Sequence, residues 1–148
     1  MSVKFRFAEE KCMACGACAI ACMDQCDVNI ETGERPLRRV TQTETDGVRR
    51  FFSVSCLHCA DAPCAAACPK GCLWHDAELG LTLYVNENCI GCRACARACP
   101  VDAPTFVTAD GKIKMKKCDG CAERVRVGLT PACVRACPVG ALTCAAEE

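Results

Sequence analysis

Aromatic residues are scarce in this sequence, because Phe, Trp and Tyr make up only 5% of its 148 residues. A chain of this length with so few large rings cannot fill a large apolar core, so we expect a bound component to occupy part of the interior. Excess charge is also absent, because 18 Lys and Arg residues balance 18 Asp and Glu residues. That balance leaves no basic patch for nucleic acid, and no nucleic-acid partner is expected.

Long apolar runs are missing as well. No stretch approaches the roughly 20 apolar residues that a transmembrane helix needs, so direct membrane insertion is not expected. The opening residues MSVKFRFAEEKC contain neither an apolar signal core nor a cleavage site of small residues. The sequence therefore predicts a cytoplasmic protein, with export on a partner that carries its own signal as the alternative.

No catalytic constellation is visible in the sequence. It contains no Ser/His/Asp set and no Gly-rich phosphate loop. Its two histidines, His58 and His75, both lie close to cysteines, which leaves little for general acid–base chemistry. We therefore expect a non-catalytic protein in which these histidines form hydrogen bonds rather than ligate a metal.

Cysteine is abundant, with 19 residues. Sixteen of them form four blocks: Cys12, Cys15, Cys18 and Cys22; Cys56, Cys59, Cys64 and Cys68; Cys89, Cys92, Cys95 and Cys99; and Cys118, Cys121, Cys133 and Cys137. The odd total and the tight spacing argue against a disulfide framework. Cys26, Cys72 and Cys144 are left over, and we expect them to be small buried apolar residues.

The segments between the blocks alternate in a strand-like pattern. Strands are predicted at 3–7, 50–55 and 81–87, and a hairpin at 104–117 with Asp110-Gly111 as its turn. The last two cysteines of each block lie on an Ala-rich stretch about one helical turn long. The repeated unit is therefore strand, cysteine loop and short helix, which predicts an α+β fold with small antiparallel sheets.

The spacing C-x2-C-x2-C-x3-C-P is the run with which bacterial proteins hold pairs of 4Fe–4S clusters. Three loop thiolates bind one cluster, and the fourth cysteine binds the other. The third block matches this run in full, the second has one extra residue, and the first has Met23 in place of Pro. Eleven residues, 122–132, interrupt the fourth block. Four such blocks predict four 4Fe–4S clusters with all sixteen cysteines as ligands.

Structural zinc is the alternative metal. Two C-x2-C pairs complete a tetrahedral zinc site, and the second and fourth blocks alone would fit one. The third block does not match two separate C-x2-C pairs, because its loop has a third cysteine, Cys95, and its fourth, Cys99, precedes Pro100. We therefore favour iron–sulfur clusters, and a zinc-stabilised interaction module is the alternative of another class.

Two segments and one lysine are expected at the surface. The charged segment 24–47 and the interruption at 122–132 are predicted to be solvated loops, with a docking surface as the alternative. Lys117 directly precedes the fourth block. We expect it on the solvated surface, with partial compensation of cluster charge as the alternative.

Spacing alone leaves the pairing of the blocks open. The first block pairs with the second and the third with the fourth, or the first pairs with the fourth and the second with the third. Both arrangements let each fourth cysteine cross to the partner cluster.

Three phrases carry a resemblance to a known family: SCLHCADAPCAAACP, NENCIGCRACARACPVDAP and KCDGCAERVRVGLTPACVRACP. Together with the order of the blocks, over about residues 10–146, they resemble the four-cluster ferredoxin-type subunits of molybdopterin and tungstopterin oxidoreductases, the dimethyl-sulfoxide-reductase iron–sulfur subunit group. The resemblance implies the nested pairing. The implied ligand sets are Cys12, Cys15, Cys18 and Cys137; Cys22, Cys118, Cys121 and Cys133; Cys56, Cys59, Cys64 and Cys99; and Cys68, Cys89, Cys92 and Cys95.

The resemblance also implies the domains and the function. Residues 1–47 with 105–148 would form an outer bacterial-ferredoxin-like unit, and 48–104 an inserted inner one. The protein would relay single electrons between a molybdo- or tungstopterin catalytic subunit and a second partner, which is a flavoprotein, a ferredoxin, a membrane anchor or further copies of itself. A free soluble polyferredoxin is the alternative within the same class.

Overall fold

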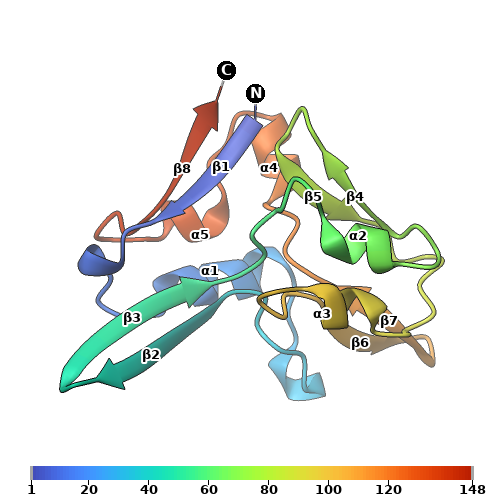
Figure 1. Ribbon diagram of the computed structural model, residues 1–148, viewed down its shortest axis with the longest axis horizontal. Coiled ribbons are helices and arrows are strands. Elements are labelled where there is room, and N and C mark those ends of the chain that lie inside the picture. The colour runs from blue at the N-terminus through green and yellow to red at the C-terminus, as the bar shows by residue number, and fades with distance from the viewer. Residues whose placement is uncertain (1, 148) are drawn as a thin grey trace.

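The computed structural model describes residues 2–147, and its elements are short. Four two-stranded antiparallel sheets alternate with small helices in this part of the chain (Figure 1). The strands are β1 (Ser2–Phe7), β2 (Arg39–Thr45), β3 (Val48–Val54), β4 (Leu73–Asp76), β5 (Leu81–Tyr84), β6 (Thr105–Ala109), β7 (Lys112–Lys116) and β8 (Leu142–Glu147). The helices are η1 (Glu9–Lys11), α1 (Ala17–Gln25), η2 (Ile30–Thr32), α2 (Pro63–Ala67), α3 (Ala94–Ala98), α4 (Ala122–Arg126) and α5 (Ala132–Arg135). The predicted α+β class is confirmed.

The first and last strands close the chain on itself. β1 pairs with β8 from Val3 opposite Ala146 to Phe7 opposite Leu142, and both termini lie at the same edge (Figure 1). The amide of Val3 also donates to the carbonyl of Leu79, 2.8 Å away, in the turn of the β4–β5 hairpin. This pairing places the first and fourth cysteine blocks next to each other.

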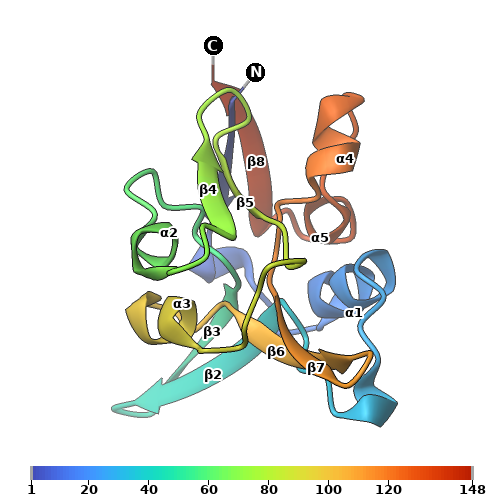
Figure 2. The ribbon, with the colours of Figure 1, turned by 90° about the vertical axis from the view of Figure 1, so that its right-hand side faces the viewer.

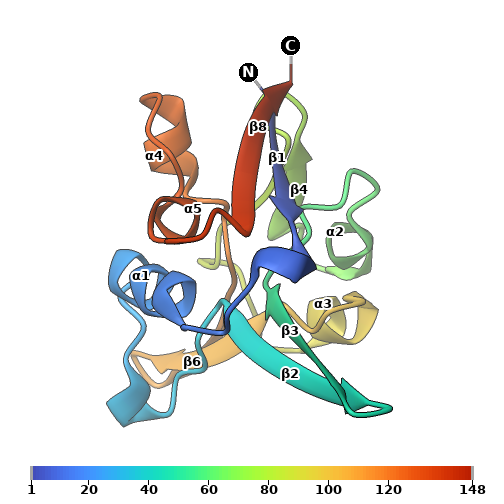
Figure 3. The same cartoon turned by 90° about the vertical axis from the view of Figure 1, so that its left-hand side faces the viewer.

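The helices pack in two pairs. α1 packs against α5, and α2 against α3. Figures 2 and 3 show α1 with α5 on one side of the molecule and α2 with α3 on the other. The helix of the first block thus lies beside that of the fourth, and the helix of the second beside that of the third.

The β2–β3 and β6–β7 hairpins form the base of the molecule in Figure 1. The predicted hairpin turn at Asp110-Gly111 is confirmed, because Ala109 faces Lys112 and both turn residues have positive φ, as this tight turn requires. The predicted boundary between residues 47 and 48 falls in the turn between β2 and β3. The division into an outer and an inner unit stays a prediction.

Two segments differ from the sequence prediction. The prediction of a solvated loop at 24–47 is wrong, because Arg39–Thr45 forms β2 and because Leu37 and Arg38 are buried. The excursion at 122–132 begins with helix α4, whose short length and flanking loop hid it from the spacing pattern. Strand β2 was missed because charged and Thr residues give it no clear apolar alternation.

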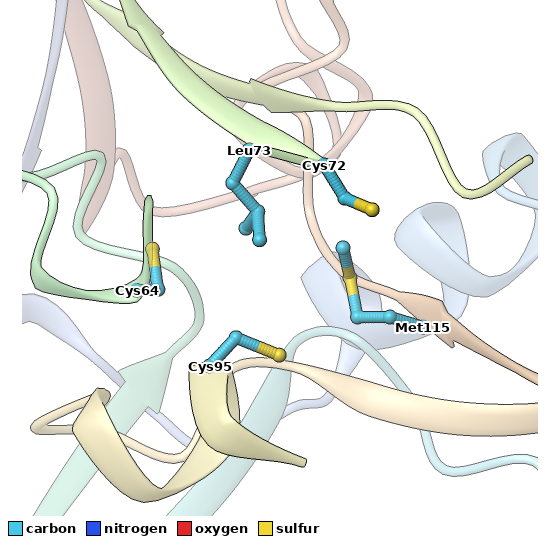
Figure 4. Close-up of a cluster of buried hydrophobic side chains, with 5 residues drawn as sticks. All are labelled: Cys64, Cys72, Leu73, Cys95 and Met115. Carbon is cyan, nitrogen blue, oxygen red and sulfur yellow. The ribbon is translucent and has the colours of Figure 1, made fainter. Parts of the chain in front are cut away.

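The core consists of four small clusters of buried side chains, all containing or contacting cysteines. In the one drawn in Figure 4, Leu73 points into the space bounded by Cys64 of α2, Cys95 of α3 and Met115 of β7, and the side chain of Met115 extends toward Cys72. Cysteines thus occupy positions that large apolar residues fill in other proteins of this size. Within residues 2–147, no helix has the length and apolar character needed to cross a membrane.

Candidate iron–sulfur cluster sites

Every cysteine block uses the same strained loop geometry. The residue before the second cysteine has a positive φ in each block, as does the residue that precedes the following helix. The first group is Ala14, His58, Gly91 and Gly120, and the second is Gly16, Ala62, Arg93 and Cys121. Left-handed backbone at non-glycine residues costs about 1–2 kcal/mol each. Its recurrence in all four blocks indicates a shared functional requirement.

The loops aim backbone amides at cysteine sulfurs. The amide of His58 donates to Sγ of Cys56 and that of Gly120 to Sγ of Cys118, each across 3.4 Å. Two fourth cysteines accept equivalent bonds at 3.3 Å, Cys68 from the amide of Cys72 and Cys99 from the amide of Ala103. Amides directed at sulfur stabilise thiolates and tune the metal that they bind.

Gly120 provides a test of this loop geometry. A Cβ at this position would collide with Cδ2 of the fully buried Leu81 and lie 2.9 Å from its Cδ1, at a φ of +72°. Gly120→Ala is therefore expected to lower the free energy of unfolding by about 2–4 kcal/mol, from backbone strain and overpacking together. Anaerobic urea unfolding of the iron-loaded protein measures it.

Gly128→Ala is the matched control. Gly128 has a similar φ of +77°, but a Cβ there would meet nothing within 4 Å. Its substitution should cost only the strain of left-handed backbone, about 1–2 kcal/mol. Equal losses for the two variants would contradict the close packing of Gly120 on Leu81.

One cavity brings together the ligand set that spans the two ends of the chain. It is lined by Cys12, Cys15, Cys18 and Cys137. Its remaining walls are mainly apolar and include Phe7, Val40 and Leu142. The fourth cysteine at this cavity comes from the fourth block, which the β1–β8 pairing carries to the first block.

A second cavity brings together the set implied for the third block. Cys68, Cys89, Cys92 and Cys95 line it. Leu73, Phe106 and Met115 form part of its apolar wall. Here the fourth cysteine comes from the second block, carried to the third by the packing of α2 on α3.

The cysteines of the other two sets also lie near one another. Cys22 is close enough to Cys118 and Cys133 for their charges to interact, and the charges of Cys121 and Cys133 also interact. In the second block, Cys59 and Cys64 each interact with Cys56 and Cys99. All sixteen predicted ligands therefore have neighbours from their implied set. Ligation itself stays a prediction.

The three remaining cysteines differ in their surroundings. Cys72 is only 3% exposed and packs in the core, as expected of a small apolar residue. Cys26 and Cys144 are only half-buried. Cys26 hydrogen-bonds Cys22, which raises the pKa of Cys22 and lowers that of Cys26.

Burial makes several of the thiols poor acids. It raises the pKa of Cys118 to about 12 and those of Cys95 and Cys121 to about 11. These thiols remain protonated near neutral pH unless a metal replaces the proton, because a bound cation stabilises the thiolate. Their protons therefore leave when metal binds.

Two buried cations lie among these cysteines. Arg38 is 4% and Lys117 2% exposed. The prediction that Lys117 lies on the solvated surface is wrong, because the chain between β7 and the fourth block runs through the interior. Neither cation forms an ion pair with a carboxylate within residues 2–147. Buried charges of this kind require a compensating charge.

Arg38 also retains an unused donor. Its terminal nitrogens donate to Ser53 and Ser55, while Nε is buried and has no partner among the described residues. Burial raises the pKa of the nearby Cys133 thiol, and the positive charge of Arg38 partly offsets this increase. An all-thiolate donor set, amides aimed at sulfur and buried cations without carboxylates together fit anionic iron–sulfur clusters.

His58 is buried in the second cysteine block, close to Cys118 of the fourth. Its ring is 7% exposed and stacks on Phe5 with 5.6 Å between centroids. Burial, aided by the charge of Lys117, lowers the pKa of His58 to about 3, so the ring is neutral. Its Nε2 lies 3.7 Å from Sγ of Cys118, which agrees with the prediction that it forms a hydrogen bond to a cysteine sulfur. No point within residues 2–147 gathers three His, Cys, Asp or Glu side chains around a single metal ion.

Cysteine loops, short paired helices and small antiparallel sheets define the class of ferredoxin-like iron–sulfur electron-transfer proteins. Residues 47–147 match the family model described as the 4Fe-4S dicluster domain. This match covers more than half of the chain, which therefore belongs to the 4Fe-4S dicluster domain family and binds 4Fe–4S clusters.

Curated relatives agree with this family. The B subunit of anaerobic dimethyl sulfoxide reductase from Haemophilus influenzae is 40% identical over 137 residues, covering 86% of this chain and 65% of that protein. The formate dehydrogenase iron-sulfur subunit of Wolinella succinogenes is 38% identical over 124 residues, covering 81% and 60% respectively. The chain thus spans less than two thirds of the length of these relatives. The resemblance inferred from the cysteine phrases is confirmed.

Proposed function

We propose that this chain is an electron-transfer subunit that holds four 4Fe–4S clusters. The observation that carries the proposal is that two cavities are each lined by four block cysteines from two different blocks: Cys12, Cys15, Cys18 and Cys137 in one, and Cys68, Cys89, Cys92 and Cys95 in the other. We name the sites A (Cys12, Cys15, Cys18, Cys137), B (Cys22, Cys118, Cys121, Cys133), C (Cys56, Cys59, Cys64, Cys99) and D (Cys68, Cys89, Cys92, Cys95). A bound 4Fe–4S cluster supplies one-electron redox chemistry.

The contacts between sets support a single row of sites. Cys18 of site A and Cys133 of site B pack in the same group of buried side chains. Cys22 and Cys118 of site B pack with Cys56 of site C. Cys64 of site C and Cys95 of site D pack together in a further group of buried side chains. The order A, B, C, D lets the protein matrix pass electrons from one end to the other.

The two end sites suit exchange with partners. Cys15 of site A and Cys92 of site D are exposed, whereas all cysteines of the two inner sites are buried or half-buried. Two similar relatives are named as parts of dimethyl sulfoxide reductase and formate dehydrogenase. We therefore place a molybdo- or tungstopterin catalytic subunit at one end. A flavoprotein, ferredoxin, membrane anchor or further copy of the chain occupies the other.

The residues of this chain bind and insulate the redox groups and take no part in bond-making. Apolar walls at sites A and D exclude water, which limits unwanted reactions of the reduced state. Amides and buried cations stabilise negative charge at the cysteine sulfurs. The proposed outer unit, 1–47 with 105–148, holds sites A and B, and the inner unit 48–104 holds sites C and D.

Metal analysis tests the proposal. After anaerobic purification, we expect about sixteen irons and about sixteen sulfides per chain, because four cubane clusters carry these numbers. Stoichiometric zinc in a colourless protein would support the interaction module and sink the proposal. Size exclusion of native lysate then separates a subunit from a free carrier, because a free polyferredoxin always elutes at the mass of one chain.

A further inference from the structure

Two side chains cross between the inner sites in opposite directions. Lys117 directly precedes Cys118 of site B, yet its ammonium lies 3.5 Å from Sγ of Cys56 in site C. His58 lies between Cys56 and Cys59 of site C, yet its Nε2 lies 3.7 Å from Sγ of Cys118 in site B. Each cysteine loop thus sends a donor to a sulfur of the other loop.

The ammonium of Lys117 is held in one position. It donates to the carbonyls of Thr82, at 2.5 Å, and Cys118, at 2.6 Å, and its third bond goes to Cys56. The ring of Tyr84 lies 5.8 Å away and adds a cation–π contact. With all three donors engaged and no carboxylate partner within residues 2–147, its charge acts on Cys64 of site C and on Cys118 of site B.

The neighbours of His58 determine which of its nitrogens carries the proton. The amide of Thr82 donates to Nδ1 at 3.0 Å, so Nδ1 is the acceptor. In the neutral ring the proton is then on Nε2, which faces Cys118. Thr82 therefore orients both donors, because its amide directs His58 and its carbonyl holds Lys117.

We propose that Lys117 and His58 are positioning residues that raise the reduction potentials of sites B and C and join the two sites into one electron path. This inference rests on the proposed function, since it requires both sites to hold clusters. A positive charge or an N–H donor at a ligand sulfur stabilises the more negative, reduced state, which raises the potential. Each crossed bond also provides a short covalent and hydrogen-bonded route from one ligand sulfur to the next site.

The electron count is simple. One electron leaves the reduced site and enters the oxidised one, and no bond to a substrate forms or breaks. The reductant is the partner at one end of the row, and the oxidant is the partner at the other.

Redox titration followed by EPR tests the proposal in the iron-loaded full chain. Lys117→Met removes the charge and keeps most of the side-chain length. At a fixed ambient potential, we expect the reduced-to-oxidised ratio at two of the four clusters to fall about tenfold, which is 59 mV for a one-electron couple. Lys117→Arg keeps the charge and should restore most of that ratio. His58→Phe keeps the stacking on Phe5 and should lower the ratio at one cluster only.

Lys112→Met is the matched control, since it removes the same charge from an exposed position on β7. It should leave all four potentials unchanged. Unchanged potentials in both Lys117→Met and His58→Phe would overturn the proposal. Loss of iron from Lys117→Met and Lys117→Arg alike would also overturn it, because Lys117 would then serve assembly. A wild-type protein without iron would instead refute the proposed function.

Discussion

Removing the iron is expected to unfold this protein. Its core consists of four small groups of buried side chains, and predicted ligand cysteines are members of three of them. Within residues 2–147, four of the five α-helices have only four or five residues, and the sheets have two strands each. Helices and hairpins of that size are not stable alone in water.

The loss of metal should therefore abolish the cooperative unfolding transition, as it does in small proteins whose fold depends on metal. Anaerobic acid treatment with a chelator, followed by circular dichroism and a urea titration, measures the effect. Protein kept with the chelator at neutral pH, where the iron stays bound, is the control. Protected backbone amides in the β1–β8 pair of the iron-free chain would contradict the expectation.

Cys137→Ser is expected to damage the cluster of the first block, 119 residues away in sequence from Cys18 (137 − 18). Cys137 lines the same cavity as Cys12, Cys15 and Cys18. Burial alone would raise the pKa of its thiol, but hydrogen bonds from the backbone amides of residues 139–142 lower it. These amides therefore favour the thiolate. The hydroxyl of Ser is a harder and less acidic ligand than a thiolate, so iron is lost there.

Iron content should fall from about sixteen per chain to between about twelve and about fifteen, as one cluster loses an iron or is lost entirely. EPR of the reduced protein should show the change in a single cluster. Cys144→Ser is the matched control, because Cys144 is a half-buried cysteine on β8 outside all four sets. A change confined to the cluster of Cys89, Cys92 and Cys95 would refute the nested pairing.

Local patterns in the sequence were sufficient for the class of site. The spacing of Cys89, Cys92 and Cys95 reflects the reach of one loop around one cluster, which depends on neighbouring residues alone. The hairpin at Asp110-Gly111 is equally local, because a two-residue turn sets the register of both strands. Helix α4 and strand β2 were missed, since their side chains show neither a clear period nor a ligand spacing.

The burial of individual side chains could not be deduced from such local patterns in the sequence. Lys117 precedes a cysteine as Lys11 does, and nothing in the two neighbourhoods distinguishes them. Lys11 is exposed, whereas Lys117 is 2% exposed and contacts Thr82 and Cys56. Those contacts join segments 35 and 61 residues apart. Only the packing of β5 and the second block against the fourth creates them.

The sequence by itself determined that this is an iron–sulfur protein with an α+β fold, because cluster ligation and tight turns are short-range properties of the chain. The tertiary structure decided which cysteine loops face each other, and that Lys117 and His58 cross between the loops of the second and fourth blocks. These features depend on long-range pairing of β1 with β8 and of α2 with α3. Such contacts result from the packing of the whole chain and leave no local pattern in its sequence.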